Sequence, residues 1–269
     1  MAIKAVFSDI DGTLLNSDES ITPATKKAIR KAVEKGISFV LVSARLPSGM
    51  LPMQEELEIE TPMISYGGAL VLSSAEKDAE IIYGVKLSPA SVKKVYQTVK
   101  EQCKDVHCAL YGQDEWRVND PENEWMKREE ATVNVPPVKE NLDEYVEKEP
   151  PVYKMLCTGN AEELAKLEKI LKEELSGVTV HKSKENNLEV VPEEASKATA
   201  IEKVLEKLEI RQEETLAFGD NYNDVDMLKF AGIGIAMGNA PDEVKQEADE
   251  VTASNDEDGI KDAIEKHIL

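Results

Sequence analysis

Short apolar runs are spaced along both ends of the chain, with polar segments between them. They are IKAVF (3–7), ISFVLVSAR (37–45), PMISYGG (62–68), TLAFGD (215–220) and GIGIAMG (232–238). Each run is nearly continuous, which is typical of a strand buried on both faces of a parallel sheet. After the first run, Thr22 and Pro23 begin a segment of helical periodicity that Gly36 ends. This alternation predicts an α/β fold, a doubly wound parallel-sheet core of Rossmann-like type.

The middle of the chain follows a different pattern. A hairpin, a strand, an amphipathic helix and two further strands are predicted at VHCALYGQDEWRV (106–118), YKMLCTG (153–159), AEELAKLEKILKEEL (161–175), VTVHKS and NLEVVP. We therefore expect a discontinuous core, residues 1–83 and 192–269, with an inserted α+β domain, residues 84–191. The acidic segment EKEPPVYK (147–154) is interpreted as a solvated loop.

Composition narrows the class of protein. The 269 residues are 41% hydrophobic, enough for one large or two modest cores. No apolar stretch is long enough for a membrane span, and acids follow the N-terminal residues where a signal peptide would stay apolar, so we expect a cytoplasmic protein. The formal net charge of −21 opposes binding to nucleic acid or to anionic membranes. The expected partner is a small molecule, and the sequence does not indicate an oligomeric state.

The cysteines and histidines indicate no metal centre. Cys103, Cys108 and Cys157 are odd in number and form no CxxC pair, which argues against a disulfide framework or a zinc site. We interpret them as buried or surface thiols. The three histidines are scattered without a metal-ligand spacing.

Four polar clusters fall where the predicted strands and helices meet. They are DIDGTLL (9–15), SAR (43–45), ASKATAI (195–201) and GDNYNDVDML (219–228). In open parallel sheets, ligands bind beyond the carboxyl ends of the strands. We expect these clusters to lie together there.

Two carboxylates one residue apart need a positive neighbour. Asp9 and Asp11 would project on the same side of a strand end and repel each other. Asp9, Asp220 and Asp224 would converge on one point, which a hard divalent cation makes tolerable. Oxygen ligands without a His/Cys set favour Mg²⁺ over zinc. The simpler alternatives are turn formation for Asp9 and Asp11, and a first-turn helix residue for Asp224.

Together these clusters resemble the haloacid dehalogenase (HAD) superfamily of phosphohydrolases. The segment AMGNAPDEVKQEADEVTASNDEDGI (236–260) is similar to the C-terminal part of the Cof-like branch, whose cap is of type IIB. The resemblance implies a magnesium-dependent phosphatase of small phosphorylated metabolites, with sugar phosphates as the default substrates. A phosphomutase or phosphotransferase with the same nucleophile is the alternative. A phospho-aspartate signalling module fits poorly, because such a module is a single small domain without an insertion.

The resemblance also implies a role for each matching residue. Asp9 would be the nucleophile that forms an aspartyl-phosphate, and Asp11 the general acid and then the general base. Mg²⁺ would be held by the Asp9 carboxylate, the Asp11 backbone carbonyl and Asp220, while Asp224 orders the metal's waters or Lys197. The expected donors to the phosphate oxygens are Ser43, Lys197, Asn223 and the backbone N–H groups of Ile10 and Ala44, with Gly12 and Thr13 holding the turn.

Several of these residues have simpler interpretations. Ser43 could be only a helix N-cap, and Lys197 only a solvated lysine at a helix start, although a cation there opposes the helix dipole. The chain departs from the family pattern at Ala198, where Gly is usual, and at Gly67, where Asn is typical. Cap residues that could meet the leaving group, none of them favoured over the others, are Tyr111, Trp116, Arg117, Lys182 and Asn186.

Overall fold

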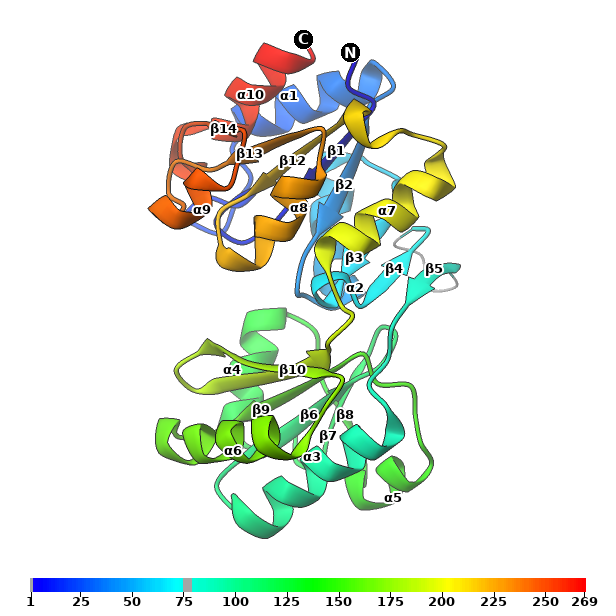
Figure 1. The fold of residues 1–269 in the computed structure, drawn as a ribbon, viewed down its shortest axis with the longest axis vertical. Helices are drawn as coiled ribbons and strands as arrows, with labels where there is room; N and C mark the ends of the chain where they lie inside the picture. The colour runs from blue at the N-terminus through cyan, green and yellow to red at the C-terminus, as the bar shows by residue number, and fades with distance from the viewer. Residues whose placement is uncertain (1, 75–78) are drawn as a thin grey trace. The chain divides into compact units, whose positions relative to one another are not determined.

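The computed structural model describes residues 2–74 and 79–269 (Figure 1). The chain forms two compact units. The first comprises Met1–Ala44, Met50–Tyr83 and Ser196–Leu269, and the second comprises Arg45–Gly49 and Gly84–Ala195. The second unit runs past residue 191, the expected end of the insertion, because strand β11 continues to Pro192 in the sheet of that unit.

The first unit is built on a mostly parallel sheet. Its strand order is β14-β13-β12-β1-β2-β3-β4-β5. The strands are β1 (Ala5–Ser8), β2 (Ser38–Val42), β3 (Met63–Ser65), β4 (Leu70–Leu72), β5 (Ile81–Gly84), β12 (Thr215–Gly219), β13 (Ile233–Ala236) and β14 (Glu250–Val251). From β1 the chain builds outward through β2 and β3, and later on the other side through β12 and β13. The switch point of this doubly wound sheet therefore lies between β1 and β12.

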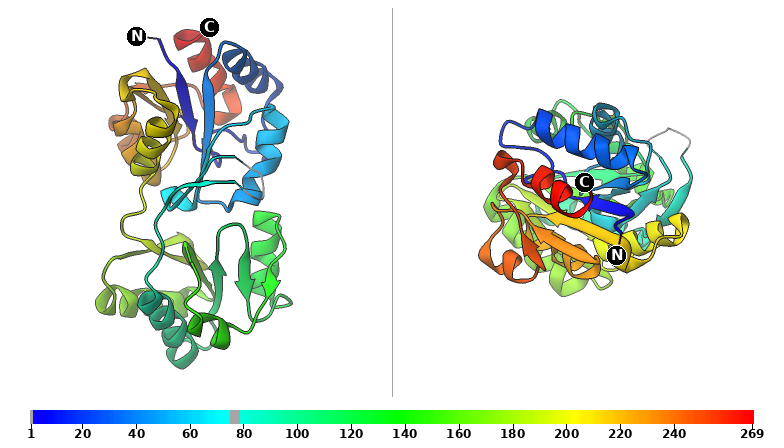
Figure 2. Two further views of the ribbon diagram at one scale, coloured as in Figure 1. Left: turned by 90° about the vertical axis from the view of Figure 1, so that its right-hand side faces the viewer. Right: turned by 90° about the horizontal axis from the view of Figure 1, so that it is seen from above.

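Helices cover both faces of this sheet (Figures 1 and 2). They are α1 (Pro23–Glu34), α2 (Pro47–Leu57), α7 (Lys197–Leu208), α8 (Val225–Phe230), α9 (Asp242–Gln246) and α10 (Gly259–His267), with one-turn helices η1 (Tyr66–Gly68), η2 (Gln212–Glu214), η3 (Tyr222–Asp224) and η4 (Asn255–Glu257). Helices α7 and α8 pack on one face, where Ile201 and Leu228 join Phe7 and Val40 in a buried apolar cluster. Figure 2 shows α1 and α10 on the opposite face.

Local sequence explains where α1 begins and ends. The Thr22 hydroxyl accepts a hydrogen bond from the Thr25 N–H at 3.1 Å, and Pro23 occupies the first turn. Buried Ala28, Ile29 and Ala32 form its inner face. Gly36 follows the helix with a left-handed φ of 85°.

The second unit is a six-stranded sheet with helices. The strand order is β10-β11-β9-β6-β7-β8, and all its pairs are antiparallel except β7 with β8. The strands are β6 (His107–Tyr111), β7 (Trp116–Val118), β8 (Val138–Lys139), β9 (Lys154–Thr158), β10 (Val178–Lys184) and β11 (Asn187–Pro192).

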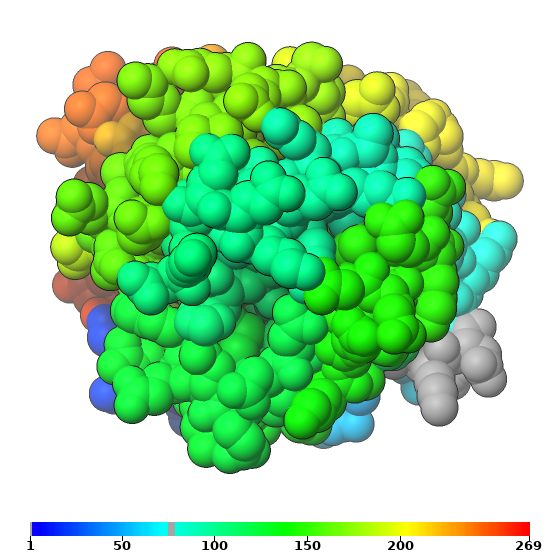
Figure 3. Space-filling view, turned by 90° about the horizontal axis from the view of Figure 1, so that it is seen from below, coloured from blue at the N-terminus to red at the C-terminus, as the bar shows by residue number. Residues whose placement is uncertain are grey.

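Helices α3 (Pro89–Gln102), α5 (Leu142–Glu147) and α6 (Ala161–Glu174) share one apolar core with this sheet, which includes Val95, Val146 and Leu167. Figure 3 shows these three helices at the surface in teal, green and yellow-green. The fourth helix, α4 (Glu124–Val133), contributes buried Met126, Glu129 and Val133.

The sequence pattern located the main elements. The α/β class with a parallel-sheet core and a second sheet is confirmed. The edge strands β5, β8 and β14, and β4 next to β5, were not predicted. The segment 147–154 is exposed or half-buried through Pro151, as a solvated loop would be, but Tyr153 and Lys154 are buried, and Lys154 begins β9 within the strand expected at 153–159. Among the described residues, no helix is long and apolar enough to cross a membrane.

Candidate active site

The carboxyl ends of β1 and β12 bring two of the predicted polar clusters together. Ser8, the last residue of β1, is aligned with Phe218 of β12 and with Leu41 of β2. The Asp9 N–H continues this pairing by donating to the Phe218 carbonyl at 3.0 Å. Asp9 therefore leaves the sheet at the switch point, directly beside the segment that begins at Asp220.

A buried lysine lies between two acids of this cluster. The Lys197 ammonium donates to Asp9 Oδ1 and to Asp224 Oδ1, each at 2.5 Å. The side chains of Lys197 and Asp224 are each only 1% exposed. The alternative of a solvated Lys197 is therefore wrong, whereas Asp224 is an acid of the first turn of η3 that also binds Lys197.

The cluster contains three acids and one lysine, and the pKa values of its members are shifted from their ordinary values. Burial raises the pKa of Asp9 well above its usual range, and the carboxylates of Asp224 and Asp220 raise it further, against the opposing effect of Lys197. Burial also raises the pKa of Asp220 to about 6, with a further contribution from Asp224. Burial alone would lower the pKa of Lys197, but Asp9 and Asp224 overcome it and hold that pKa above its ordinary value.

Both oxygens of Asp224 are engaged by the protein. Oδ1 accepts from Lys197, and Oδ2 accepts from the backbone N–H groups of Asp220 at 3.0 Å and Asn221 at 2.9 Å. Of the two roles expected for Asp224, the ordering of Lys197 is the one that these contacts favour. The Thr13 hydroxyl donates to Asp220 Oδ1 at 2.7 Å, so Thr13 orients this acid across the two strand ends.

Gly12 allows the first loop to approach Asp220. Its φ is +82°, and a Cβ at this position would lie 2.5 Å from Asp220 Oδ2. The Gly12 carbonyl accepts from the Asn239 side-chain amide at 2.8 Å. Asn239 is thus a positioning residue that was not predicted, although it lies in the segment AMGNAPDEV.

Asp226 fixes the start of α7, and with it Lys197. Its Oδ2 accepts from the Ser196 hydroxyl at 2.7 Å and from the Ala198 N–H at 3.2 Å. Ser196 is also the N-cap of the helix, since its Oγ accepts from the Thr199 N–H. Asp226 was not predicted as a site residue, and its only signal in the sequence was its position two residues after Asp224.

The remaining predicted site residues surround this cluster. Asp11 is exposed, and its carboxylate is close enough to help raise the pKa of Asp220. Ile10 follows Asp9 with its side chain fully buried. Ser43 is buried directly after β2, followed by half-buried Ala44, while Asn223 is exposed in η3. These positions place all of them in the first unit, at or just beyond the ends of β1, β2 and β12.

The donor set fits a hard divalent cation. Carboxylate oxygens of Asp9, Asp220 and Asp224 all lie within 4.8 Å of one another. One lysine does not balance three acids: burial is the main cause that raises the pKa values of Asp9 and Asp220, and the neighbouring carboxylate of Asp224 raises both further. Oxygen-only ligands of this kind suit Mg²⁺.

One departure from the family pattern has a conformational explanation. Gly67 has a left-handed φ of 64°, a conformation that Asn adopts more readily than most residues. Glycine therefore preserves the backbone there but supplies no side-chain amide.

The cap residues considered at the outset are mostly engaged within the second unit. Tyr111 and Trp116 are buried and stack with their ring centroids 5.8 Å apart. Arg117 donates to Glu115 and Glu140 and lies over the Tyr145 ring. These contacts give the three side chains structural roles.

The fold and the cluster define an α/β enzyme whose site lies at the switch point of a parallel sheet. A family model of haloacid dehalogenase-like hydrolases matches residues 6–264, so the chain belongs to this family, and it is a hydrolase of the phosphatase type. A Haemophilus influenzae protein is 37% identical over 262 residues, which are 97% of this chain and 96% of that protein.

Two further relatives carry more specific names. The 5-amino-6-(5-phospho-D-ribitylamino)uracil phosphatase YcsE of Bacillus subtilis is 30% identical over 271 residues, 99% of this chain and 96% of that protein. The structure of the HAD subclass IIB sugar phosphatase BT4131 matches with a TM-score of 0.80 at 28% identity, covering 98% of each chain.

Proposed function

We propose that this protein is a magnesium-dependent phosphatase that hydrolyses small phosphorylated metabolites through a phosphoryl group carried on Asp9. The observation that supports it best is the buried Asp9–Lys197–Asp224 arrangement beside Asp220. A nucleophilic carboxylate, a fixed cation and a set of hard oxygen ligands are what phosphoryl transfer requires.

Asp9 is the nucleophile in this proposal. One of its oxygens is held by Lys197, while the other accepts no hydrogen bond in the described residues, 2–74 and 79–269. Attack on phosphorus forms an Asp9 acyl-phosphate and releases the substrate oxygen. Lys197 neutralises negative charge on the phosphoryl oxygens, and Asp224 keeps its ammonium in place. Ser43, Asn223 and the N–H groups of Ile10 and Ala44 are the proposed neutral donors.

Asp11 transfers the protons. It protonates the departing oxygen in the first step and then removes a proton from the water that hydrolyses the Asp9 acyl-phosphate. Its exposed side chain, in contrast to buried Asp9, suits a group that exchanges protons with substrate and water.

Mg²⁺ would be held by the Asp9 carboxylate, the Asp11 backbone carbonyl and Asp220. When bound, it supplies positive charge that offsets both the acid cluster and the phosphate dianion. Thr13 fixes Asp220 for this purpose through its 2.7 Å hydrogen bond.

Sugar phosphates and similar monoesters are the proposed substrates. Support comes from the two named relatives, one a ribitylaminouracil phosphatase and the other a sugar phosphatase. The formal charge of −21 gives no long-range attraction for an anionic substrate, so capture depends on the local positive charge of Lys197 and the metal.

The test is phosphate release from a panel of phosphorylated metabolites, with Mg²⁺ and with excess chelator. We expect turnover only with the metal, and none in Asp9→Asn. Full activity in chelator would contradict the metal assignment. Conversion of a sugar phosphate into an isomer without phosphate release would instead identify a mutase.

A second experiment tests the role of Asp11. Asp11→Asn should slow single-turnover cleavage of an alkyl phosphate by about 10²- to 10⁴-fold, because the alkoxide needs a proton. An aryl phosphate leaves with little help, so it should give a burst of aryl alcohol and label trapped on Asp9. Asp18→Asn, an exposed acid of the same loop, is the control. Equal loss on both substrates without a burst would refute the dual role.

A further inference from the structure

Two cysteines of the second unit face each other across neighbouring strands. Cys108 of β6 and Cys157 of β9 are directly paired in the antiparallel register, and their sulfur atoms are 3.7 Å apart. Both are free thiols and both are buried. A disulfide would require the two sulfurs to approach to about 2.05 Å.

The backbone already allows that bond. Directly opposed residues of antiparallel strands have Cα atoms about 4.5–5.5 Å apart, which lies within the range of about 4.4–6.8 Å seen in disulfides. Closing the bond therefore requires side-chain rotation and little movement of β6 or β9.

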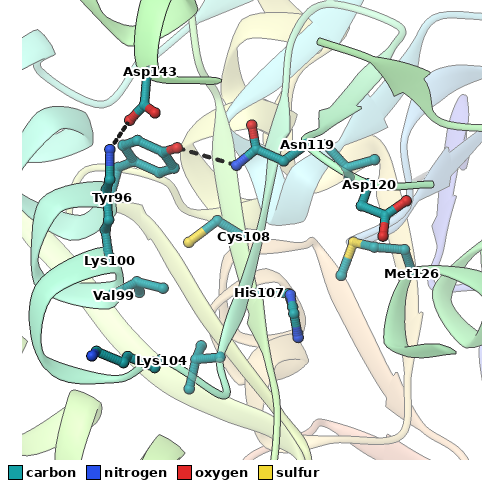
Figure 4. A pocket seen from close by; sticks show the side chains of 12 residues that line it. Tyr96, Val99, Lys100, Lys104, His107, Cys108, Asn119, Asp120, Met126 and Asp143 are labelled. Carbon is teal, nitrogen blue, oxygen red and sulfur yellow. Dashed lines mark hydrogen bonds and ion pairs between the residues drawn. The ribbon is translucent and has the colours of Figure 1, made fainter. Parts of the chain in front are cut away.

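Cys108 lines a cavity of the second unit (Figure 4). The cavity has a volume of about 380 Å³, and Cys108 lines it while Cys157 does not. In Figure 4 Cys108 lies between Tyr96 and His107, with Lys100 and Lys104 also among the lining side chains. Cys157 is 0% exposed in the core between the sheet and helices α3 and α6. A small reagent can thus reach Cys108 first.

We propose that Cys108 and Cys157 form an oxidation site, in which a peroxide converts the pair into an intrachain disulfide. The Cys108 thiolate attacks one oxygen of the peroxide, which forms a sulfenic acid and expels hydroxide or alkoxide, and that leaving group takes up a proton. The Cys157 sulfur then attacks the Cys108 sulfur, the S–O bond breaks, and the Cys157 proton leaves with the hydroxide as water. Each pair of thiols consumes one peroxide.

The surroundings of the pair favour this order of events. The sulfur contact with Cys108, together with burial, raises the pKa of Cys157 well above its usual range, so Cys157 stays protonated while Cys108 is reduced. Lys100 and Lys104 line the cavity beside Cys108 together with Asp120 and Asp143, and the Lys100 ammonium lies 2.6 Å from the Asp143 carboxylate.

The chain contains its own control. Cys103 is also buried, but it is the C-cap of α3, is not paired across strands and does not line the cavity. Burial is the main cause that raises the pKa of Cys103, and the nearby Cys157 adds to the effect. A Cys103–Cys157 bond is therefore the competing product that an experiment must distinguish.

The test treats the reduced, full-length protein with hydrogen peroxide and follows thiol content, intact mass and non-reducing peptide maps. Wild type and Cys103→Ser should both lose two thiols and two hydrogen atoms, join the peptides that contain Cys108 and Cys157, and recover on reduction. The bond closes a loop of 49 residues, so oxidation should raise the melting temperature by about 5 °C or more.

The single variants separate the two roles. In Cys157→Ser, Cys108 should gain one or two oxygen atoms instead of forming a disulfide, and a cyclic-diketone probe should trap its sulfenic acid. In Cys108→Ser, Cys157 should react at least about tenfold more slowly, because it has no access to the cavity. A disulfide through Cys103, accumulation of oxygen adducts on Cys108 in wild type, or thiols that react only after unfolding would each overturn the proposal.

Discussion

Each of the two units buries a lysine beside acidic side chains, and the two clusters differ in their balance of charge. In the first unit, Lys197 contacts Asp9 and Asp224 at 2.5 Å, with Asp220 nearby. In the second, Lys154 lies 3.7 Å from the Glu189 carboxylate and 4.6 Å from the centre of the Tyr111 ring. The side chains of both lysines are at most 6% exposed.

The pKa values of the acids differ between the two clusters, because positive and hydrogen-bonding neighbours offset the cost of burying the charge to different extents. Burial opposes the ionisation of Glu189, but Lys154 and the Ser183 hydroxyl outweigh it and lower its pKa. In the first unit burial prevails, so the pKa of Asp9 is raised although Lys197 is in contact. The Lys154–Glu189 ion pair in the second unit therefore stabilises the fold. The excess of negative charge in the first unit is unfavourable on its own and is suited to binding a cation.

The largest expected effect comes from removing Lys197. Lys197→Met should lower kcat/KM for phosphate release by about 10³-fold, or about 4 kcal/mol, because a buried positive charge no longer faces the phosphoryl oxygens. Steady-state kinetics with saturating Mg²⁺ measures this. Lys207→Met, which removes an exposed lysine of the same helix, should have little effect. A loss below about tenfold in Lys197→Met would place that side chain outside the chemistry.

Breaking the balanced pair should affect stability. Glu189→Gln removes a carboxylate that lies 3.7 Å from the buried Lys154 ammonium and should lower the free energy of unfolding by about 3 kcal/mol, measured by urea denaturation. The double variant Lys154→Met/Glu189→Leu should recover most of that loss, because it removes both charges. Glu185→Gln, an exposed neighbour, is the control. A double variant no more stable than Glu189→Gln would mean that the packing, and not the charge, is at fault.

The difference in unfolding free energy between wild type and Glu189→Gln should depend on pH, with a sign that the pKa of Glu189 defines. The change with pH should be smaller than the effect of the substitution itself. The folded pKa of Glu189 is below its unfolded value of about 4.3, so its stabilisation is present above about pH 4.3 and is lost as pH falls through the folded pKa. The difference between wild type and Glu189→Gln should therefore be constant from about pH 7 to pH 5 and then shrink. A difference that grows on acidification would contradict the lowered pKa.

The sequence located most of the first cluster because its residues follow apolar runs. The ends of β1 and β12 gave Asp9 and Asp220, and the helix start after Ser196 gave Lys197, since a lysine opposing the helix dipole needs another purpose. Asp226 and Asn239 were missed because they act through hydrogen bonds to Ser196 and to the Gly12 carbonyl, which depend on long-range folding.

The balanced cluster could not be predicted in the same way. Lys154 follows the polar segment EKEPP, and its burial depends on β9 pairing with β6 and β11, which brings Tyr111 and Glu189 alongside it. The facing of Cys108 and Cys157 depends on the same register. A periodic pattern identifies the strands, but it does not fix which residues of two strands distant in sequence lie opposite each other.

The smallest expected effect concerns Asp220, and it runs opposite to the effect at Glu189. The pKa of Asp220 is raised by burial to about 6, above its unfolded value of about 3.9, so its ionised form is disfavoured in the folded protein. The group therefore contributes its full stability below about pH 3.9, loses it as pH rises through about 6, and opposes folding at pH 7.

Asp220→Asn keeps an oxygen for the Thr13 hydroxyl and should stabilise the metal-free protein at about pH 7. The gain should be about 1 kcal/mol, because the side chain is half-buried and solvent screens the charge. Near pH 4 this gain should vanish, and Mg²⁺ should raise the melting temperature of wild type and of Asp18→Asn but not of Asp220→Asn. A metal-free Asp220→Asn that is less stable than wild type at pH 7 would show that this cluster is as well satisfied as the Lys154–Glu189 pair, and the contrast between the two units would fail.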